Sequence, residues 1–450
     1  MSCTTVLSLG IKTLVTQVAC VVLTIFANLA FAASPSLPDS ADYLGEIRRG
    51  PDGTLTVTPK PPSSAETRSA DSAPSTLRVG RFQTYTTIAA AANDARNGDT
   101  VEIEAGNYVG DVAIWTQDNL TIRAIGGPAR LIANGRHVER KGIWIIRGGK
   151  ITAENIEFSG ARVEHKNGAG IRFEKGHLII RNCAFFDNEN GILTHNDETT
   201  ELDIENSEFG RNGYGDGQTH NIYVGSIKRF RMTGSYSHHA NVGQLVKSRA
   251  KETYILYNRL TDETGRASYE IDLPSGGIAY IIGNIIQQSP NATNGHFISF
   301  GVEGYKWDKN ELYLVNNTII DNRPSNGRFL LLKNGPGTVH AVNNILLGPD
   351  TLNPADRPNA LSRPDGQLPG TYRNNPHARL EDFTNPENYD YTLKADSKLR
   401  NTAVNPGIFN KFVLSPKRQY RHPLKIIDLN QAATHPGAIQ IETGRGQISP

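Results

Sequence analysis

The sequence is poor in cysteine, with only Cys3, Cys20 and Cys183 among its 450 residues. Cys3 and Cys20 lie in an N-terminal segment that we expect to be cleaved off, so one cysteine remains in the mature chain. A single cysteine cannot form an internal disulfide, and the fold must therefore be stable without one. We interpret Cys183 as a small buried apolar residue.

A strong charge imbalance is also missing. The chain has 47 Lys and Arg residues against 45 Asp and Glu, a formal net charge of +2, and it contains no basic run. Proteins that bind nucleic acids usually carry a clustered basic face, so we expect no nucleic-acid partner. No motif has the spacing of metal ligands. Hydrophobic residues at 38% and charged residues at 20% are typical of a soluble globular protein.

Residues 1–32 are typical of a secretory signal peptide. Lys12 supplies a positive charge, residues 15–32 are mostly apolar, and residues 30–32 form an A-x-A cleavage site. Thr16 and Gln17 interrupt the apolar region, which disfavours a permanent membrane anchor, and no second such segment follows. We expect a periplasmic or secreted protein that has no membrane partner after cleavage.

Composition divides the remaining chain into three segments. Residues 33–80 are rich in proline, serine and alanine, as in the stretch TPKPPSSAETRSADSAPS, and they predict a flexible linker. Residues 81–350 are periodic and predict the main domain. Residues 351–450 are less periodic and rich in proline, and we expect an irregular segment that packs on the outside of the main domain.

An apolar pattern that contains asparagine recurs about every 25 residues in the main domain. Its copies are ITAENIEF, LIIRNCAF, LDIENSEF, YILYNRLT, YIIGNIIQ, LYLVNNTII and VHAVNNILL. Each repeat also has an earlier strand-like stretch, such as GIWII or YEIDL, and none has a helical pattern. Such repeats predict a parallel β-helix, because stacked coils can share an apolar interior that one coil cannot bury.

The repeated asparagines are predicted to occupy equivalent turns of successive coils. Asparagine tolerates the left-handed backbone conformation, and stacked side-chain amides can hydrogen-bond along the axis of the solenoid. We therefore assign a structural role to Asn155, Asn182, Asn206, Asn258, Asn284, Asn317 and Asn344.

The coil pattern and the stretch GDTVEIEAGNY resemble the pectate-lyase-like superfamily over about residues 80–350. The resemblance implies an all-β fold, a right-handed parallel β-helix or solenoid, to which the composition adds the irregular C-terminal tail. An alanine-rich stretch after Thr86 and Thr87 predicts an N-terminal helix that caps the solenoid. Function follows only in outline, because lyases, hydrolases, epimerases and binding proteins share this fold.

Two strand-like stretches carry charges at the same spacing. QLVKSR contains Lys247 and Arg249, and YEIDL contains Glu270 and Asp272. Because side chains alternate between the two sides of a strand, we expect these four side chains on one external face of adjacent coils. The alternative explanation is an ordinary cross-strand ion pair.

Further polar residues are predicted near these charges. Gly225 should leave space beside Lys247, and Trp144 should belong to an outward row. Glu270, Asp272 and Asp216 are candidate calcium ligands, and no other cofactor is expected. The neighbouring residues expected on this face are His195, Asp216, His220, Tyr223, His238 and His239.

The stretch LVKS followed by YILYNRLTDE resembles the alginate-lyase and chondroitinase-B-like polysaccharide lyases, and Lys247 matches the catalytic base of that family. This resemblance implies β-elimination on an acidic polysaccharide. The chain departs from the family at two places. The family's arginine falls near Asp272, and its calcium ligands fall near Ala240 and Val242.

Elimination from a uronate needs a cation near the carboxylate, a base, and a proton donor for the leaving oxygen. The residues predicted for catalysis are Lys247, Arg249, His220 and Tyr223, and those predicted for substrate binding are His195, His239, Glu270 and Asp272. We expect a monomer whose partner is an acidic, uronate-containing exopolysaccharide.

Three alternatives to a lyase stay open. A C5-epimerase would share the proton abstraction. An inverting glycoside hydrolase would use Glu270 and Asp272 as its two carboxyl groups, although the polygalacturonase motifs are missing. A non-catalytic carbohydrate-binding β-helix would assist polymer export.

Overall fold

The structure is a computed structural model that describes residues 47–49, 55–57, 73–324, 327–348 and 369–440. The chain divides into two units, residues 1–72 and 73–450. In the first unit, β1 (Ile47–Arg49) and β2 (Leu55–Val57) form an antiparallel pair. The predicted signal peptide and most of the predicted linker lie outside the described residues. Within the described part of the chain, no helix has the length and apolarity needed to cross a membrane.

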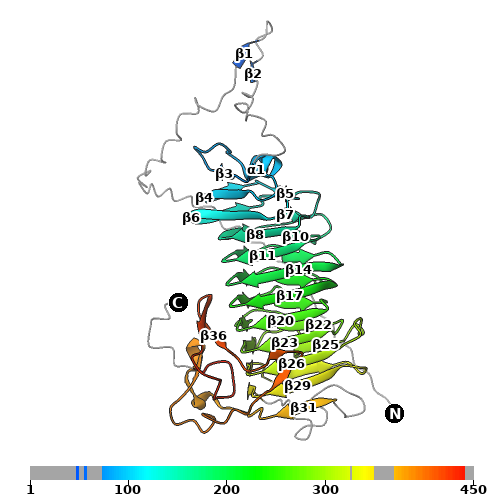
Figure 1. The fold of residues 1–450 in the computed structure, drawn as a ribbon, viewed down its shortest axis with the longest axis vertical. Coiled ribbons are helices and arrows are strands. Elements are labelled where there is room, and N and C mark those ends of the chain that lie inside the picture. The colour runs from blue at the N-terminus through cyan, green and yellow to red at the C-terminus, as the bar shows by residue number, and fades with distance from the viewer. Residues whose placement is uncertain (1–46, 50–54, 58–72, 325–326, 349–368, 441–450) are drawn as a thin grey trace, which may run out of the picture. The chain divides into compact units, whose positions relative to one another are not determined.

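The second unit is a solenoid in which each coil adds strands to three parallel faces (Figure 1). The first face is a sheet of nine strands. They are β5 (Ala113–Trp115), β7 (Gly142–Ile146), β10 (Ala169–Phe173), β13 (Asn190–Thr194), β16 (Ile222–Val224), β19 (Val246–Ser248), β22 (Ile271–Leu273), β25 (His296–Phe300) and β28 (Arg328–Leu332).

The second and third faces follow the first face within each coil. The second face contains β8 (Lys150–Glu154), β11 (His177–Arg181), β14 (Asp197–Glu205), β17 (Ile227–Thr233), β20 (Glu252–Leu256), β23 (Ile278–Ile282), β26 (Glu311–Val315), β29 (Thr338–Val342) and β31 (Gly370–Arg373). The third contains β9 (Ile156–Ser159), β12 (Ala184–Phe186), β15 (Glu208–Gly210), β18 (Tyr236–His238), β21 (Arg259–Thr261), β24 (Ile285–Gln288), β27 (Thr318–Asp321) and β30 (Ile345–Leu347). The predicted parallel β-helix is confirmed.

A short helix covers the N-terminal end of the solenoid, as predicted. Helix α1 (Ile88–Asp94) begins after Thr87, whose Oγ1 accepts a hydrogen bond from the Ala90 amide at 3.2 Å. The first strands are β3 (Thr76–Val79), β4 (Thr100–Val109) and β6 (Leu120–Ile132), and β6 pairs with both β8 and β9. The solenoid thus begins a few residues earlier than the predicted boundary at residue 81.

The interior contains a stack of aromatic rings. Trp144 packs edge-on against Trp115 at 5.2 Å and against Phe158 at 4.9 Å, and Phe158 stacks on Phe185 at 4.9 Å. Trp144 is fully buried, so its predicted outward position is wrong. Cys183 is buried as expected, and this burial raises the pKa of its thiol to about 12.

The repeated asparagines occupy two neighbouring columns, so their prediction as one equivalent set is wrong. Asn155, Asn182 and Asn206 have left-handed backbones, with φ of 60°, 50° and 47°. The strand register pairs Arg259 with Tyr236, which places Asn258 one position later in its coil. In the later coils the left-handed position belongs to Gly234, Tyr257, Gly283, Asn316 and Asn343.

The later column forms a buried amide ladder, as expected from stacked asparagines. Nδ2 of Asn258 donates to Oδ1 of Asn284 at 3.1 Å, Asn284 donates to Asn317 at 3.0 Å, and Asn317 donates to Asn344 at 2.9 Å. Each Nδ2 also donates to a backbone carbonyl, such as that of Ile255 for Asn284. The ladder satisfies polar groups that would otherwise be costly to bury.

Residues 374–440 pack on the outside of the second and third faces (Figure 1). Tyr391 and Tyr420 join the apolar cluster of Ile285 and Ile345, and Phe412 packs on Tyr280. The elements of this segment after β31 are η2 (Leu380–Asp382), β32 (Phe383–Asn385), η3 (Pro386–Asn388), β33 (Asp390–Leu393), β34 (Ile408–Phe409), β35 (Phe412–Val413), β36 (Arg418–Arg421) and β37 (Lys425–Asp428).

Candidate active site

Tyr223, Lys247 and Asp272 form a row across three neighbouring strands of the first face. The register pairs Tyr223 of β16 with Lys247 of β19, and Lys247 with Asp272 of β22. The strand pattern predicted Gly225 beside Lys247, but this prediction is wrong by two residues, because the register places Gly225 beside Arg249. Since Tyr223 takes that place, a ring lies where an open space was expected.

Lys247 and Arg249 share one carboxylate. Nζ of Lys247 lies 3.1 Å from Oε1 of Glu303, and the Arg249 guanidinium pairs with Oε2 of the same residue. Nζ of Lys247 also lies 3.1 Å from Oδ2 of Asp272. Lys247 and Asp272 are only 9% and 2% exposed, whereas the side chain of Glu303 is 47% exposed. The cluster is therefore fixed at its base and open at Glu303.

Tyr223 is held between the cations and His220. Its hydroxyl accepts a hydrogen bond from Nη1 of Arg249, and its ring faces the Arg249 guanidinium at 5.1 Å and Lys247 Nζ at 5.9 Å. The His220 ring stacks with the Tyr223 ring at 5.3 Å. Attraction between cations and the π face contributes to holding both basic side chains in place.

His220 is buried and neutral. Burial, followed by the nearby charges of Lys247 and Arg249, holds the pKa of His220 well below its usual value. Nδ1 accepts a hydrogen bond from the Gln244 amide at 3.1 Å, so the proton of the neutral ring lies on Nε2. His220 is therefore better suited to positioning Tyr223 than to accepting a proton from a substrate.

Asp272 is oriented by its neighbour on the next coil. The hydroxyl of Ser299 donates to Oδ1 of Asp272, and Oδ2 faces Lys247. Ser299 and Asp272 are paired in the register of β25 and β22. The carboxylate therefore has a fixed position, and it holds Lys247 in the row.

Sequence reasoning missed Glu303, which closes the cluster from a loop that follows β25. The Glu303 amide donates to the Pro274 carbonyl at 3.0 Å, and Nε1 of Trp307 donates to the Arg249 carbonyl at 3.2 Å. Partial burial opposes ionisation of Glu303, but hydrogen bonds from Arg249 and Lys247 outweigh it and lower its pKa. The available clue was its place after FISFG, one coil beyond YEIDL.

Glu270 does not share the external face, and its predicted position is wrong. It is fully buried, and Nε2 of Gln288 donates to its Oε2 at 3.2 Å. Burial, with a further contribution from Asp262, raises the pKa of Glu270 well above its usual value. Glu270 precedes β22 at a bend of the coil, so the alternation of a regular strand does not extend to it.

His239 is also placed away from Lys247, contrary to the prediction for it and His238. His238 is the last residue of β18 and His239 follows it, and their Nδ1 atoms lie 2.8 Å apart. His238 further contacts Glu208 at 3.1 Å, and His239 contacts Thr264 at 3.4 Å. These two histidines form a separate cluster with residues of the third face.

His195 and Asp216 lie at the surface. His195 follows β13, and the register of the first face aligns it with Gly225 and Arg249 in one outward column. It is exposed and lies two coils from Arg249. Asp216 lies in an exposed turn, where its Oδ1 accepts the Gln218 amide at 3.0 Å.

The candidate calcium ligands do not come together. Glu270 faces the interior, Asp272 contacts Lys247 and Ser299, and Asp216 lies in its own turn. Across residues 73–440, as far as the structure describes them, no group of three or more His, Cys, Asp or Glu residues is arranged to hold a metal ion.

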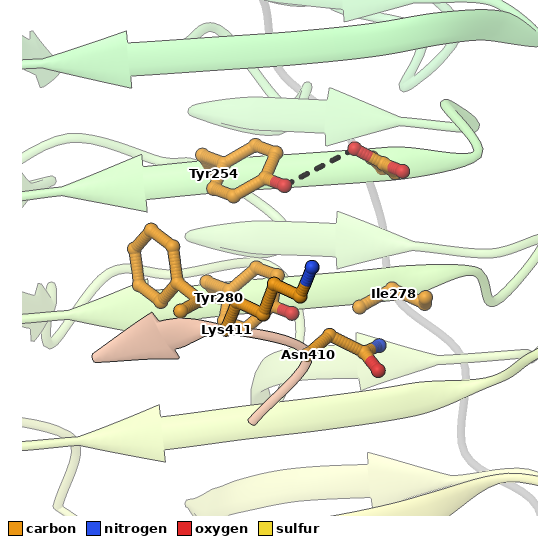
Figure 2. Close-up of a pocket in the computed structure, with 7 residues that line it drawn as sticks. Tyr254, Ile278, Tyr280, Asn410 and Lys411 are labelled. Atoms are coloured by element: carbon orange, nitrogen blue, oxygen red, sulfur yellow. Dashed lines mark hydrogen bonds between the residues drawn. The ribbon is translucent and has the colours of Figure 1, made fainter. Parts of the chain in front are cut away.

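A pocket of about 210 Å³ lies on the second face, outside the Lys247 cluster (Figure 2). Tyr254 and Tyr280 stack at 5.0 Å along one side, and the turn between β34 and β35 forms the other. The hydroxyl of Tyr254 donates to Glu252 at 3.1 Å. The lining residues are Glu252, Tyr254, Ile278, Tyr280, Asn410, Lys411 and Phe412.

Neither a protein-family model nor a curated protein matches the sequence. Among solved structures, the chain is similar to one described as the crystal structure of pectate lyase Pel9A. The two share 12% identity with a TM-score of 0.54, and the match covers 82% of this chain and 97% of the other. The chain is a pectate-lyase-like right-handed parallel β-helix. At this identity the likeness shows the fold alone, and it agrees with the predicted right-handed parallel β-helix.

On this pectate-lyase-like β-helix, the outer side of the first face presents two cations that already hold a carboxylate. Lys247 and Arg249 reach the two oxygens of Glu303. With Asp272 and Glu303 the group has two positive and two negative side chains. If Glu303 left, one positive charge would be in excess, and the site could bind an anion of the same shape.

Proposed function

We propose that this protein is a polysaccharide lyase that acts on an acidic, uronate-containing polysaccharide. The observation that carries the proposal is the convergence of Lys247 and Arg249 on one carboxylate at the outer side of the first face. A uronate carboxylate has the same charge and the same two-oxygen geometry. A parallel β-helix of this kind also offers a long surface to an extended polymer.

The proposed reaction is β-elimination. Neutralisation of the uronate carboxylate makes the C5 proton more acidic, and a base removes that proton. The electron pair forms a double bond between C4 and C5, the bond between C4 and the glycosidic oxygen breaks, and this oxygen takes up a proton. The products are a shortened chain and a chain with an unsaturated uronate at its new end.

Lys247 and Arg249 are assigned to the carboxylate in this proposal. Two carboxylate oxygens lie 3.1 Å from the Lys247 amine, an arrangement suited to an ammonium group that binds anions. Tyr223 lies directly beside both cations and is the proposed proton-transfer group. The alternative is that Lys247 acts as the base, as the resemblance of LVKS to polysaccharide lyases implies.

The geometry disfavours the hydrolase alternative. An inverting hydrolase needs two carboxyl groups facing one bond of the substrate, but Glu270 is buried while Asp272 faces outward. An epimerase would use the same surface and return a proton to C5 instead of breaking the bond at C4. A carbohydrate-binding protein without activity would use it only to hold the polymer.

The test is incubation of the purified protein with polygalacturonate, alginate and a glucuronate polymer. A lyase produces the ultraviolet absorbance of an unsaturated uronate, together with shorter chains. The methyl ester of the same polymer is the matched control, because it lacks the charge that Lys247 and Arg249 would bind. New reducing ends without the chromophore would indicate a hydrolase, and unchanged chain length with altered C5 configuration would indicate an epimerase.

A further inference from the structure

The carboxylate of Glu303 occupies the place between Lys247 and Arg249 in the way that a bound acidic sugar would. Its two oxygens face two different cations, one on each side. It reaches them from a loop more than fifty residues later in the chain. A buried structural ion pair would be enclosed, but the Glu303 side chain is nearly half-exposed, at 47%.

The backbone of the loop is fastened at Glu303 itself and three residues later. The Glu303 amide donates to the Pro274 carbonyl at 3.0 Å, and the Lys306 amide donates to the Ser275 carbonyl at 2.9 Å. Nζ of Lys306 pairs with Glu198 at 2.7 Å. Release of the cations therefore requires only rotation of the Glu303 side chain, while the loop stays in place.

The other contacts of the two cations do not depend on Glu303. Lys247 keeps Asp272, whose orientation is fixed by Ser299. Arg249 keeps the hydroxyl and the ring of Tyr223. After rotation of Glu303, both donors would stay in position with one unbalanced positive charge.

We propose that Glu303 is a built-in competitor, whose carboxylate is displaced by the carboxylate of a uronate residue when the polymer binds. The proposal rests on the proposed function for the class of its ligand. It makes Glu303 a residue that sets affinity and selectivity for carboxylated sugars. A neutral sugar could not displace it, because one of the two positive charges would be left without a counter-charge.

The test compares Glu303→Gln with the original protein in the binding of galacturonate, guluronate and glucuronate oligomers by calorimetry. The glutamine has the same shape and lacks the charge, so we expect the dissociation constant of the preferred oligomer to fall by about two- to fivefold, the range of half-exposed ion pairs. Glu198→Gln is the matched control, since it removes the Lys306 ion pair of the same loop and leaves both cations untouched. Its affinity should equal that of the original protein.

Several outcomes would overturn the proposal. Equal or weaker binding by Glu303→Gln, or no binding of any uronate oligomer by either protein, would show that Glu303 does not compete. Tighter binding by both variants would assign the effect to a loosened loop. The binding result is independent of turnover. Tighter binding by Glu303→Gln without an unsaturated product would support the competitor role of Glu303 and reject the lyase function. Lyase activity with unchanged binding would support the lyase function and reject the competitor role.

Discussion

Lys247 and Asp272 face each other on adjacent coils, with Nζ 3.1 Å from Oδ2, and both are almost completely buried. The pair explains why one strand of the first face carries cations and the next carries an anion. Asp272 holds the Lys247 side chain across the strands, and Glu303 contacts the same ammonium group from the loop after β25. The cross-strand ion pair is thus part of the same cluster that we propose as the active site.

Asp272→Asn should weaken both the fold and the proposed activity. The amide keeps the shape and a partner in Ser299, but the Lys247 ammonium loses a counter-charge. We expect the free energy of unfolding to fall by about 1–3 kcal/mol, with a clear loss of turnover. Urea denaturation and product formation measure the two effects. Unchanged stability and turnover would show that Asp272 does not position Lys247.

Lys247→Ala should abolish the proposed activity while the protein stays folded. Removal of one acid, base or charge-stabilising group typically lowers turnover by at least about a hundredfold. Lys247→Arg separates the two roles, because arginine keeps the charge but is not deprotonated in proteins. Retained turnover in this variant indicates carboxylate neutralisation, and lost turnover with retained oligomer binding indicates a base. A folded Lys247→Ala protein with full turnover would remove this cluster from consideration.

Asn284→Ala should destabilise the solenoid without changing the first face. The side chain of Asn284 accepts from both the amide and Nδ2 of Asn258, and it donates to Asn317 and to the Ile255 carbonyl. Loss of these buried hydrogen bonds should lower the free energy of unfolding by about 2–4 kcal/mol. The exposed Asn167 provides the control for the same substitution. Equal urea midpoints for the two variants would contradict a supporting role for the ladder.

Stability should fall as the pH rises, because of carboxyl groups buried within the coils. Burial, opposed by the Ala267 amide and aided by the charge of Glu263, raises the pKa of Asp262 from 3.8 to about 7, and Glu270 shifts in the same direction. A raised folded-state pKa means that the folded chain binds the proton more tightly. The free energy of unfolding therefore decreases between the unfolded and the folded pKa. For Asp262 this window runs from about pH 4 to pH 7, with a loss of up to about 4 kcal/mol.

Glu270→Gln isolates the contribution of that residue. The neutral amide should raise the urea midpoint at pH 8 and flatten its dependence on pH. Exposed Glu164→Gln is the control and should leave the profile unchanged. The variant should also retain the proposed activity, because Glu270 faces the interior. If the products of the original protein lack the unsaturated chromophore and Glu270→Gln abolishes their formation, the hydrolase alternative would be restored.

Local sequence patterns predicted a large part of this architecture. The recurrence of short apolar stretches indicated stacked coils, and the alanines after Thr87 indicated the capping helix. The predicted single column of asparagines failed by one residue at Asn258. Both positions of the turn accept asparagine for different reasons, one for its left-handed backbone and the other for its side-chain amide. A pattern of residue types does not distinguish these reasons.

The coil period and the apolar interior could be predicted from the sequence, because they follow from residues a few positions apart. The placement of Lys247, Arg249 and Asp272 on neighbouring strands followed from the same repeat. The inward direction of Glu270 and the contact of Glu303 with the two cations could not be predicted in this way. The direction of a side chain at a bend depends on backbone angles that alternation does not predict, as at Glu270. The contact of Glu303 depends on the stacking of coils, which brings together residues more than fifty positions apart.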